Sequence, residues 1–571
     1  MTGRTVRSSA AVRGGPLLVG VDLGTTGVKV VVVDAETGGT VARCYRDYPS
    51  DTGRPGRHEQ DPADWWRVTA GTLREALAGV DPDAVAAVGL SGHMHAVALF
   101  DDRDRPVRPA LTWADRRAVD EVRRLREQGD LFGELTGNPV VEAFSAPKLA
   151  WLVRHEPEAV RRAVRLVQPK DVLRHRLTGD WSTDPTDAAG TLLYDVVRRR
   201  WEPRLWASCG ADERLAPPVR GSTELVGEVR PAAAELTGLP AGTPVVAGAG
   251  DVSCAALGAG AVADGRVYVN VGTAAQIVSP VAEPRAGVDR FVFARAGEEG
   301  FLGMVSSYAA GLAIRWAERN LLGTGGGQVP DGTADRLAAG SDPGAAGLTF
   351  LPYLLGASAP IHDPAVRAAL LGVGPEHGPA DVARATLEGV AYACAAAVSQ
   401  LLDGAGTGAG PAATEIRVGG GVTRSKVWCE AFAAGFDAPV RRLRQDASPR
   451  GAVALAGIGA GVWPDVAAAC AVLDDSEPLT VPDEHRAGYR RAGERYAAAS
   501  AAVAALHRDP TFPSGGDSVG GSGGGSGSDF GGGSDGGFGG GSDGGSGGGS
   551  EGDSGGNPGV DSGGGSGGSG R

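Results

Sequence analysis

The chain has 571 residues, which is too long for a single hydrophobic core, so we expect two domains. A formal net charge of −13 disfavours nucleic acid and anionic membranes as partners, and the sequence contains no run of about 18 apolar residues that would predict a membrane span. The six cysteines form no Cys-x-x-Cys pair, which indicates neither a zinc site nor a disulfide framework. The composition therefore predicts a cytoplasmic protein.

The first chemically unusual stretch is a predicted β-hairpin over residues 17–34, which follows a leader, residues 1–15, that we expect to be disordered. Two runs of β-branched residues flank its glycine-containing turn. Asp22 ends the first run, where a buried carboxylate is costly unless it is paired or ligates a cation. One interpretation is a tight hairpin with a capped aspartate. The other is a phosphate-binding turn in which Asp22 orients Mg²⁺ and the phosphate oxygens contact turn amides, Thr25, Thr26 and Lys29.

A strand, a helix and a second strand follow the hairpin. Residues 40–48 predict a third strand, the apolar spacing of residues 62–80 predicts an amphipathic helix, and residues 85–90 are typical of a buried strand. Met94 and His95 come directly after that strand, at the edge where open α/β sheets bind ligands. A structural histidine and a ligand-contacting histidine both fit this position.

Residues 109–117 form a second candidate loop. Trp113 and Asp115 could close over a polyol through aromatic area and a carboxylate acceptor, although Asp115 fits equally the first turn of a helix. We interpret Lys148 and the nearby arginines of the basic helical region that follows as a solvated face. Residues 183–190 predict a polar loop, for which contact with substrate is one option.

Asp251 follows a short strand and a glycine-rich turn, and it stands just ahead of an alanine-rich helix. Aspartate is a favoured N-cap residue, so capping is one interpretation. The flanking glycines let the backbone come close to a ligand, which favours a carboxylate held in a cleft and ready to accept a proton from a hydroxyl.

Residues 266–278 repeat the strand, Gly-Thr turn and strand of the first hairpin. This echo predicts a duplicated fold in which both hairpins face one nucleotide cleft. Asn270 stands where the first hairpin has its aspartate, so the second turn offers only its amides, at Gly272 and beyond, and the Thr273 hydroxyl.

A third glycine cluster comprises residues 419–421, between a strand and a helix that begins near Ser425. Its bare backbone could carry a flat adenosine. The sequence contains neither the G-x-G-x-x-G fingerprint nor a P-loop, which disfavours the two common nucleotide-binding folds. Residues 447–461 predict a helix of small residues that packs tightly against its neighbour.

The composition changes near residue 508. Residues 514–571 are almost wholly glycine, serine and acidic residues, and they carry seven acids against one arginine. Such a segment cannot bury enough apolar area to offset the entropy cost of ordering it. We therefore expect residues 509–571 to be a disordered, acidic tail without catalytic residues.

Several motifs resemble those of the FGGY family of carbohydrate kinases, and most closely its xylulokinase branch, over residues 17–500. Asp22-Leu-Gly-Thr-Thr-Gly-Val-Lys is similar to the first phosphate motif of the family. Residues 145–152 and 368–388 are similar to its N-terminal and C-terminal signatures. The segments most similar to xylulokinases are residues 136–139, 168–171, 177–179 and 187–192.

The resemblance implies an α/β fold of two actin-like, ribonuclease H-like domains, residues 16–258 and 259–508, that bind sugar and ATP between them. It implies that Asp251 is the base for the sugar hydroxyl and that Asp22 orients Mg²⁺ and the phosphates. The implied sugar contacts are Met94, His95, Trp113, Asp115 and Asp251. The implied ATP contacts are Gly24, Thr25, Thr26, Lys29, Gly272, Thr273, Gly419, Gly420, Gly421 and Ser425.

The predicted reaction is ATP-dependent phosphorylation of the terminal hydroxyl of an open-chain ketose, D-xylulose first. Three departures from xylulokinases lie on the sugar side: His93 before Met-His, Ala114 between Trp113 and Asp115, and residues 356–360. They keep two alternatives to D-xylulose open as substrates: gluconate, and another pentulose or hexulose. A non-catalytic actin-like sensor of ATP and sugar is the alternative of another class, disfavoured because a pure binder needs no base. The assembly, including a homodimer, stays open.

Overall fold

The computed structural model describes residues 4–7, 15–285, 287, 290–323, 330, 332–403 and 412–509. By internal contacts the chain divides into residues 1–535 and 536–571, and every described residue belongs to the first unit. The predicted tail lies outside the described residues, apart from Asp509. Within the leader that we expected to be disordered, residues 4–7 form a strand, so for those four residues the structure differs from the prediction. Backbone pairing with a neighbouring edge strand supplies the order.

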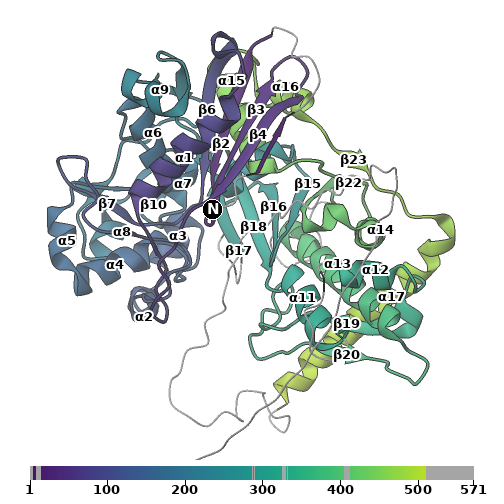
Figure 1. Ribbon diagram of the computed structural model, residues 1–571. Coiled ribbons are helices and arrows are strands. Elements are labelled where there is room, and N and C mark those ends of the chain that lie inside the picture. Colours follow the sequence, from purple (N-terminus) through teal and green to yellow (C-terminus); the bar gives the residue numbers. More distant parts are fainter. Residues whose placement is uncertain are drawn as a thin grey trace, which may run out of the picture. The chain divides into compact units, whose positions relative to one another are not determined.

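The first sheet has the strand order β1 (Arg4–Arg7), β4 (Thr40–Asp47), β3 (Gly27–Asp34), β2 (Leu17–Leu23), β6 (Val85–Gly92), β13 (Pro244–Val246) and β12 (Leu225–Glu228) (Figure 1). The strands β2, β3 and β4 form an antiparallel meander. β6 lies parallel to β2, and β13 lies parallel to β6. The short strand β14 (Ala249–Gly250) pairs with the end of β6.

The second sheet has the strand order β17 (Arg290–Ala294), β18 (Phe301–Ser307), β16 (Ala275–Val281), β15 (Arg266–Val271), β21 (Glu415–Gly420), β22 (Val440–Arg442) and β23 (Glu477–Pro478). An antiparallel meander of β15, β16 and β18 is again followed by two parallel strands, β21 beside β15 and β22 beside β21. The two sheets therefore share one topology, which confirms the duplication predicted from the two hairpins.

Helices cover both faces of the first sheet, so its strands are apolar on both sides. Val19 and Val21 face a core that includes α1 (Pro62–Leu77), and α6 (Pro169–Thr178) and α9 (Pro231–Thr237) pack beside that helix. Leu18 and Val33 face the opposite core, formed with α10 (Asp251–Gly258), α15 (Ala447–Gly459) and α16 (Val466–Leu473). Two helices from the C-terminal half of the chain, α15 and α16, thus complete the packing of the first sheet.

Glycines let α15 approach the first sheet very closely, as the small-residue pattern predicted. A Cβ atom at Gly20 of β2 would lie 2.2 Å from the Pro449 carbonyl oxygen. A Cβ atom at Gly89 of β6 would lie 1.9 Å from the Ala452 carbonyl oxygen. Neither distance is sterically allowed, so the contact between helix and sheet requires glycine at both positions.

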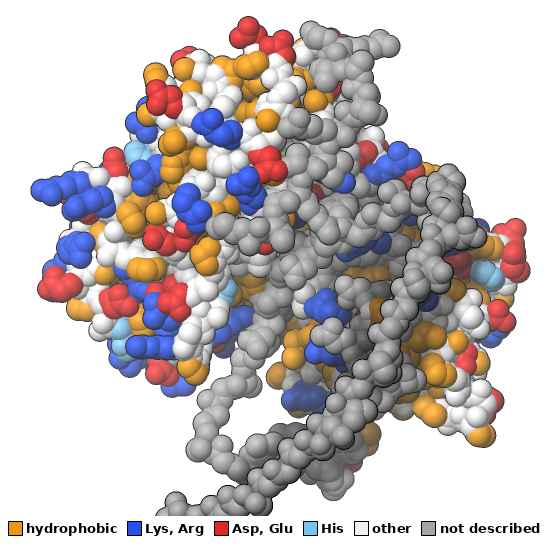
Figure 2. Space-filling view, in the orientation of Figure 1, with side chains coloured by type: hydrophobic (Ala, Val, Ile, Leu, Met, Phe, Trp, Pro, Cys, Tyr) orange, Lys and Arg blue, Asp and Glu red, His pale blue; other side chains and the backbone are white. Residues whose placement is uncertain are grey.

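One face of the second sheet packs against α11 (Gly311–Asn320), α13 (Pro379–Asp403) and α14 (Lys426–Gly435), with α12 (Thr333–Ala338) and α17 (Asp483–Arg508) further out. α13 is the one helix of the described residues that is long and apolar enough to cross a membrane, and 72% of its apolar window is buried inside the protein. We interpret it as a core helix. On the face shown in Figure 2, basic and acidic side chains are interspersed over the surface.

The remaining elements lie mainly between β7 and β12 in sequence. The short strand pairs are β5 (Glu59–Gln60) with β8 (Ala110–Leu111), β7 (Ala98–Phe100) with β9 (Arg165–Val167), β10 (Tyr194–Asp195) with β11 (Arg200–Trp201), and β19 (Thr349–Leu351) with β20 (Ala369–Leu371). The remaining α-helices are α2 (Val119–Arg126), α3 (Leu131–Thr136), α4 (Ser145–His155), α5 (Pro157–Arg162), α7 (Pro185–Ala189) and α8 (Pro203–Ser208).

Candidate active site

Asp22 lies at the carboxyl end of β2, where the register pairs it with Lys29 of β3 and Ser91 of β6. Its side chain is 5% exposed, and Ser91 Oγ donates a hydrogen bond to its Oδ1 at 2.8 Å. Burial raises the pKa of Asp22, while the Lys29 ammonium and the Ser91 hydroxyl oppose the rise. A buried carboxylate with one oxygen committed to a hydroxyl has the chemistry of a cation ligand.

The turn between β2 and β3 is fixed from several sides. Gly24 N donates to the Gly27 carbonyl at 3.0 Å, and the Thr25 carbonyl accepts from Gln60 Nε2 at 2.7 Å. Trp113 Nε1 donates to Thr25 Oγ1 at 2.8 Å. Thr25 is half-buried and Thr26 is exposed, so both remain reachable by a ligand. The structure thereby brings the predicted sugar-side Trp113 into contact with the predicted phosphate turn.

Asp251 is the first residue of α10 and follows β14, whose Gly250 lies in register with Gly92 at the end of β6. The residue is half-buried. Burial and the neighbouring Asp22 carboxylate raise the pKa of Asp251 to about 7. A carboxylate with a pKa near neutrality can take up a proton at physiological pH, which is what a general base requires. The two predicted catalytic aspartates therefore lie within electrostatic reach of each other.

Met94 and His95 lie beside this junction. Met94 is 2% exposed, and its Cγ would lie 2.6 Å from a Cβ atom at Gly250. His95 has the unusual φ of 67°, its Nδ1 lies 2.6 Å from the Gly190 carbonyl oxygen, and its ring packs edge-on against Phe144 at 4.6 Å. Burial lowers the pKa of His95 to about 3, so its ring is neutral. Because Nδ1 must carry the proton that is donated to the Gly190 carbonyl, Nε2 can accept one further hydrogen bond.

Asp115 differs from the expectation of a residue that reaches a ligand. Its side chain is completely buried and accepts hydrogen bonds from His58 N at 2.9 Å and from Arg117 Nη2 at 2.7 Å. In this conformation the carboxylate holds its own loop together, because its oxygens are already paired. We therefore assign it to the support of Trp113 rather than to direct contact with a sugar.

The second hairpin meets the glycine cluster through the sheet register. Asn270 pairs with Gly419 and Val271 with Gly420, which places Gly272 and Thr273 beside the cluster. Arg315 Nη2 donates to Thr273 Oγ1 at 3.0 Å. Gly272, Thr273, Gly420 and Gly421 are all at least partly exposed. Gly419 is buried against Tyr268, so the surface that the cluster offers to a nucleotide begins at Gly420.

Two of the predicted ATP contacts are engaged within the protein. Ser425 is 8% exposed; its hydroxyl donates to Asp335 and accepts from Trp428 N at 2.9 Å, which caps α14. Lys29 Nζ lies 3.2 Å from Asp446 Oδ2 at the start of α15. Although burial disfavours the charge, Asp446 and Asp22 hold the pKa of Lys29 above its usual value.

Lys148 corrects another expectation, that of a solvated face. Its side chain is completely buried, and Nζ donates to the carbonyl oxygens of Glu142 at 3.0 Å, of Ala143 and of Phe144 at 2.6 Å. Burial lowers the pKa of Lys148. The sequence pattern could not predict this role, because a lysine whose ammonium group is bound to three carbonyl oxygens stands in the same pattern of residues as an exposed lysine.

Residues 183–190 were also expected to be a polar loop. They contain α7, and all eight residues are buried. Their polar side chains join Lys170 and Arg174 of α6 in a completely buried charge cluster that the pattern analysis did not find. The signal that could have found it is the concentration of charged and hydroxyl residues in residues 168–187, next to runs that are otherwise apolar.

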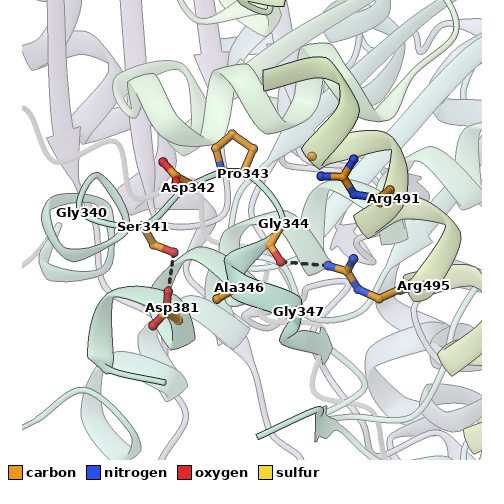
Figure 3. Close-up of a pocket in the computed structure, with 11 residues that line it drawn as sticks. Gly340, Ser341, Asp342, Pro343, Gly344, Ala346, Gly347, Asp381, Arg491 and Arg495 are labelled. Atoms are coloured by element: carbon orange, nitrogen blue, oxygen red, sulfur yellow. Dashed lines mark hydrogen bonds between the residues drawn. The ribbon is translucent and has the colours of Figure 1, made fainter. Parts of the chain in front are cut away.

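Magnesium fits the residues present. Among the described ranges no group of three or more histidine, cysteine or acidic side chains is arranged to hold a metal. Magnesium is often bound through one or two carboxylates together with water and substrate phosphates, and the buried Asp22 beside the Gly-Thr turn suits that mode. A separate cavity of about 560 Å³ lies between residues 340–347 and α17, with Arg491 and Arg495 on its wall (Figure 3). It contains none of the predicted site residues.

Comparison with known proteins agrees with this geometry. Residues 17–258 match the N-terminal domain of the FGGY family of carbohydrate kinases, and residues 267–460 match its C-terminal domain. The chain is 31% identical over 463 residues to the xylulose kinase of Bacillus subtilis, which covers 80% of this chain and 90% of that one. The structure of xylulose kinase from Rhodospirillum rubrum superimposes with a TM-score of 0.76 at 29% identity, covering 86% and 99% of the two chains. Gluconate kinase from Lactobacillus acidophilus shares the fold, with a TM-score of 0.77 at 24% identity over 86% of this chain and 98% of that one.

The two family matches together span most of the described residues and include both glycine-turn hairpins, Asp251 and the glycine cluster. The two sheets of one topology are the physical counterpart of those two matched domains. The chain therefore belongs to the FGGY family of carbohydrate kinases.

Proposed function

We propose that this protein transfers the γ-phosphoryl group of ATP to the terminal hydroxyl of D-xylulose, giving D-xylulose 5-phosphate and ADP. The observation that carries the proposal is that Asp251 lies within electrostatic reach of the buried Asp22 beside the Gly-Thr turn, and that burial and Asp22 raise the pKa of Asp251 to about 7. The similarity to xylulose kinases over most of the chain supports the choice of sugar.

Asp251 accepts the proton of the sugar hydroxyl as that oxygen forms a bond to the γ-phosphorus. The bond between the γ-phosphorus and the bridging oxygen breaks at the same centre, and ADP carries away the electron pair. Little covalent chemistry is required of the protein, because phosphoryl transfer depends on positioning and on neutralisation of charge. The neutral His95 and the buried Met94 would line the sugar side of this arrangement.

The nucleotide would lie between the two hairpins. Gly24, Thr25 and Thr26 on one side, and Gly272 and Thr273 on the other, present amides and hydroxyls that suit phosphate oxygens. Gly420 and Gly421 would carry the adenosine. Asp22 would hold Mg²⁺, which when bound neutralises phosphate charge.

Gluconate is the second candidate substrate. The Trp113-Ala114-Asp115 loop, which resembles gluconokinases, favours it, and that loop contacts the phosphate turn through Thr25. Asp115 forms an ion pair with Arg117, so it is not free to bind a sugar hydroxyl. Trp113 and its neighbours would therefore discriminate between the two substrates.

A coupled ADP-release assay over D-xylulose, other ketoses, gluconate and glycerol tests the proposal. We expect the highest kcat/KM with D-xylulose; a higher value with gluconate would establish the second candidate. Asp251→Asn should lower kcat by at least about 10²-fold, the order expected for loss of a general base, without weakening ATP binding. Asp102→Asn, which changes an exposed carboxylate after β7, is the matched control. ATP binding without ADP release on any substrate would indicate a sensor.

A further inference from the structure

A completely buried charge cluster lies behind the end of β6. Its members are Lys170, Asp171, Arg174, Asp184 and Asp187, each with 0% exposure. Lys170 Nζ lies 2.7 Å from an oxygen of Asp171, and 3.0 Å from an oxygen each of Asp184 and Asp187. A Cβ atom at Gly92, the last residue of β6, would lie 3.1 Å from Lys170 Cβ, so the lysine stands directly behind the strand end.

The cluster is connected to the backbone that carries Asp251. Asp184 caps α7 and accepts hydrogen bonds from Thr186 N at 3.0 Å and Thr186 Oγ1 at 2.8 Å. The same Thr186 Oγ1 accepts a hydrogen bond at 2.8 Å from the backbone N–H of Gly250, the residue before Asp251. The threonine hydroxyl is therefore held by the cluster on one side and holds the start of α10 on the other.

A second contact fixes the same segment. Arg174 Nη1 donates to the Ala247 carbonyl at 2.7 Å, and Nη2 of that arginine pairs with Asp171 Oδ1 at 3.0 Å. The strand-to-helix turn before Asp251 is thus tied to the cluster at residues 247 and 250. Two independent attachments restrict both its position and its orientation.

Gly250 leaves no free space at this junction. A Cβ atom there would lie 2.6 Å from Met94 Cγ and 3.0 Å from Asp187 Oδ1. Met94, a candidate sugar contact, and Asp187 of the charge cluster therefore both pack against the α-carbon of Gly250, the residue that precedes the candidate base. Burial raises the pKa of Asp187 well above its usual range, while the Lys170 ammonium opposes the rise.

Stability alone does not account for this arrangement. Burying five ionisable groups carries a large desolvation penalty, and apolar side chains of the same volume often stabilise a core as well or better. What ion pairs and hydrogen bonds add is a defined geometry, and displacing a catalytic group by about 1 Å can cost about 10²-fold in rate.

We propose that the cluster positions Asp251, with Lys170 as its anchor and Thr186 as the link to Gly250. Both are positioning residues that do not touch the sugar. The inference rests on the proposed role of Asp251 as the base.

The test compares Thr186→Val, Thr186→Ser and Thr237→Val in the full chain. Thr237 is the matched control, because it is equally buried and its hydroxyl likewise donates once, to the Ala233 carbonyl, and accepts once, from Leu239 N, on α9. We expect Thr186→Val to lower kcat about 10-fold to 100-fold with little change in the KM of the sugar. Thr186→Ser should restore kcat, and Thr237→Val should leave it unchanged at a similar loss of thermal stability.

A kcat for Thr186→Val equal to that of Thr237→Val would overturn the inference, as would a loss confined to KM. Lys170→Met should lower kcat as well. Combining it with Thr186→Val should add little further loss of kcat, because both residues act through the same contact to Gly250. Fully additive losses would show that Lys170 does not position Asp251 through Thr186. If Lys170→Met does not fold, the threonine variants decide alone. Near-normal turnover of Asp251→Asn would instead refute the proposed function, whatever the threonine variants show.

Discussion

Asp251→Asn should make the protein more stable at alkaline pH while lowering kcat by at least about 10²-fold. The folded structure raises the pKa of Asp251 from 3.8 to about 7 through burial and the nearby Asp22. Between these values the folded chain retains a proton that the unfolded chain has lost. The free energy of unfolding therefore falls as pH rises from about 4 to 7, and the asparagine variant, which never ionises, does not share that fall.

The magnitude follows from the size of the shift. Three pKa units correspond to about 4 kcal/mol at about 1.4 kcal/mol per unit, which is an upper bound. Because Asp251 is partly exposed, solvent screening reduces the effect, and we expect about 2 kcal/mol at pH 8. The advantage of Asp251→Asn should shrink steadily towards pH 5.

Urea unfolding of wild type, Asp251→Asn and the control Asp102→Asn at pH 5, 6.5 and 8 measures this difference. The kinetics give an independent estimate of the same pKa, since kcat/KM of the wild type should fall about tenfold from pH 8 to pH 6 as the base is protonated. A variant that is no more stable than wild type at pH 8, or an advantage that does not change with pH, would refute the argument from burial.

Three further predictions concern packing and the tail. Gly89→Ala should destabilise the protein by more than about 3 kcal/mol in urea unfolding, because its Cβ would meet the Ala452 carbonyl at 1.9 Å, whereas Gly378→Ala, with no atom within 4 Å, should not. Lys148→Met should cost about 3 kcal/mol by leaving the buried Phe144 carbonyl and the half-buried Glu142 and Ala143 carbonyls without their donor, and a smaller loss than in an exposed Arg105→Met control would contradict this. Deleting the residues after Arg508 should leave kcat and KM unchanged in the coupled assay; a large fall in kcat would give the tail a role.

The sequence was sufficient to predict the parts of the fold that local rules specify. The hairpin of β2 and β3 and the helix α1 are confirmed, because β-branched runs and apolar spacing leave direct traces in the residues. The repeated Gly-Thr turn was enough to predict duplication of the sheet. The packing of α15 on the first sheet was beyond this reasoning, since nothing local to residues 447–459 says which sheet they cover.

The site was predictable in its backbone turns and much less in its buried polar residues. Asp22 and Asp251 stand beside glycines, and such glycines indicate that the backbone comes close to a ligand or to a neighbouring element. Lys148 and Asp187 lie in segments whose residue types are equally typical of a solvated surface. Whether such a side chain is exposed depends on partners far along the chain, such as Lys170 for Asp187, and these partners are brought together only by the tertiary fold.

The duplication also explains why one hairpin carries a carboxylate and the other an amide. In the first sheet Asp22 has Lys29 opposite it and Ser91 beside it, so a buried negative charge is compensated and a cation can complete it. In the second sheet the register places Asn270 beside Gly419, and the Gly-Gly turn that follows offers backbone groups without a positive charge. The positive charge on this side comes from Arg315, which donates to Thr273 Oγ1, and a carboxylate at position 270 would compete with a triphosphate for it. In the proposed function, one acidic and one neutral turn would hold phosphate from both sides, and the negative charge of the protein would be concentrated on the side where Asp251 would take up its proton.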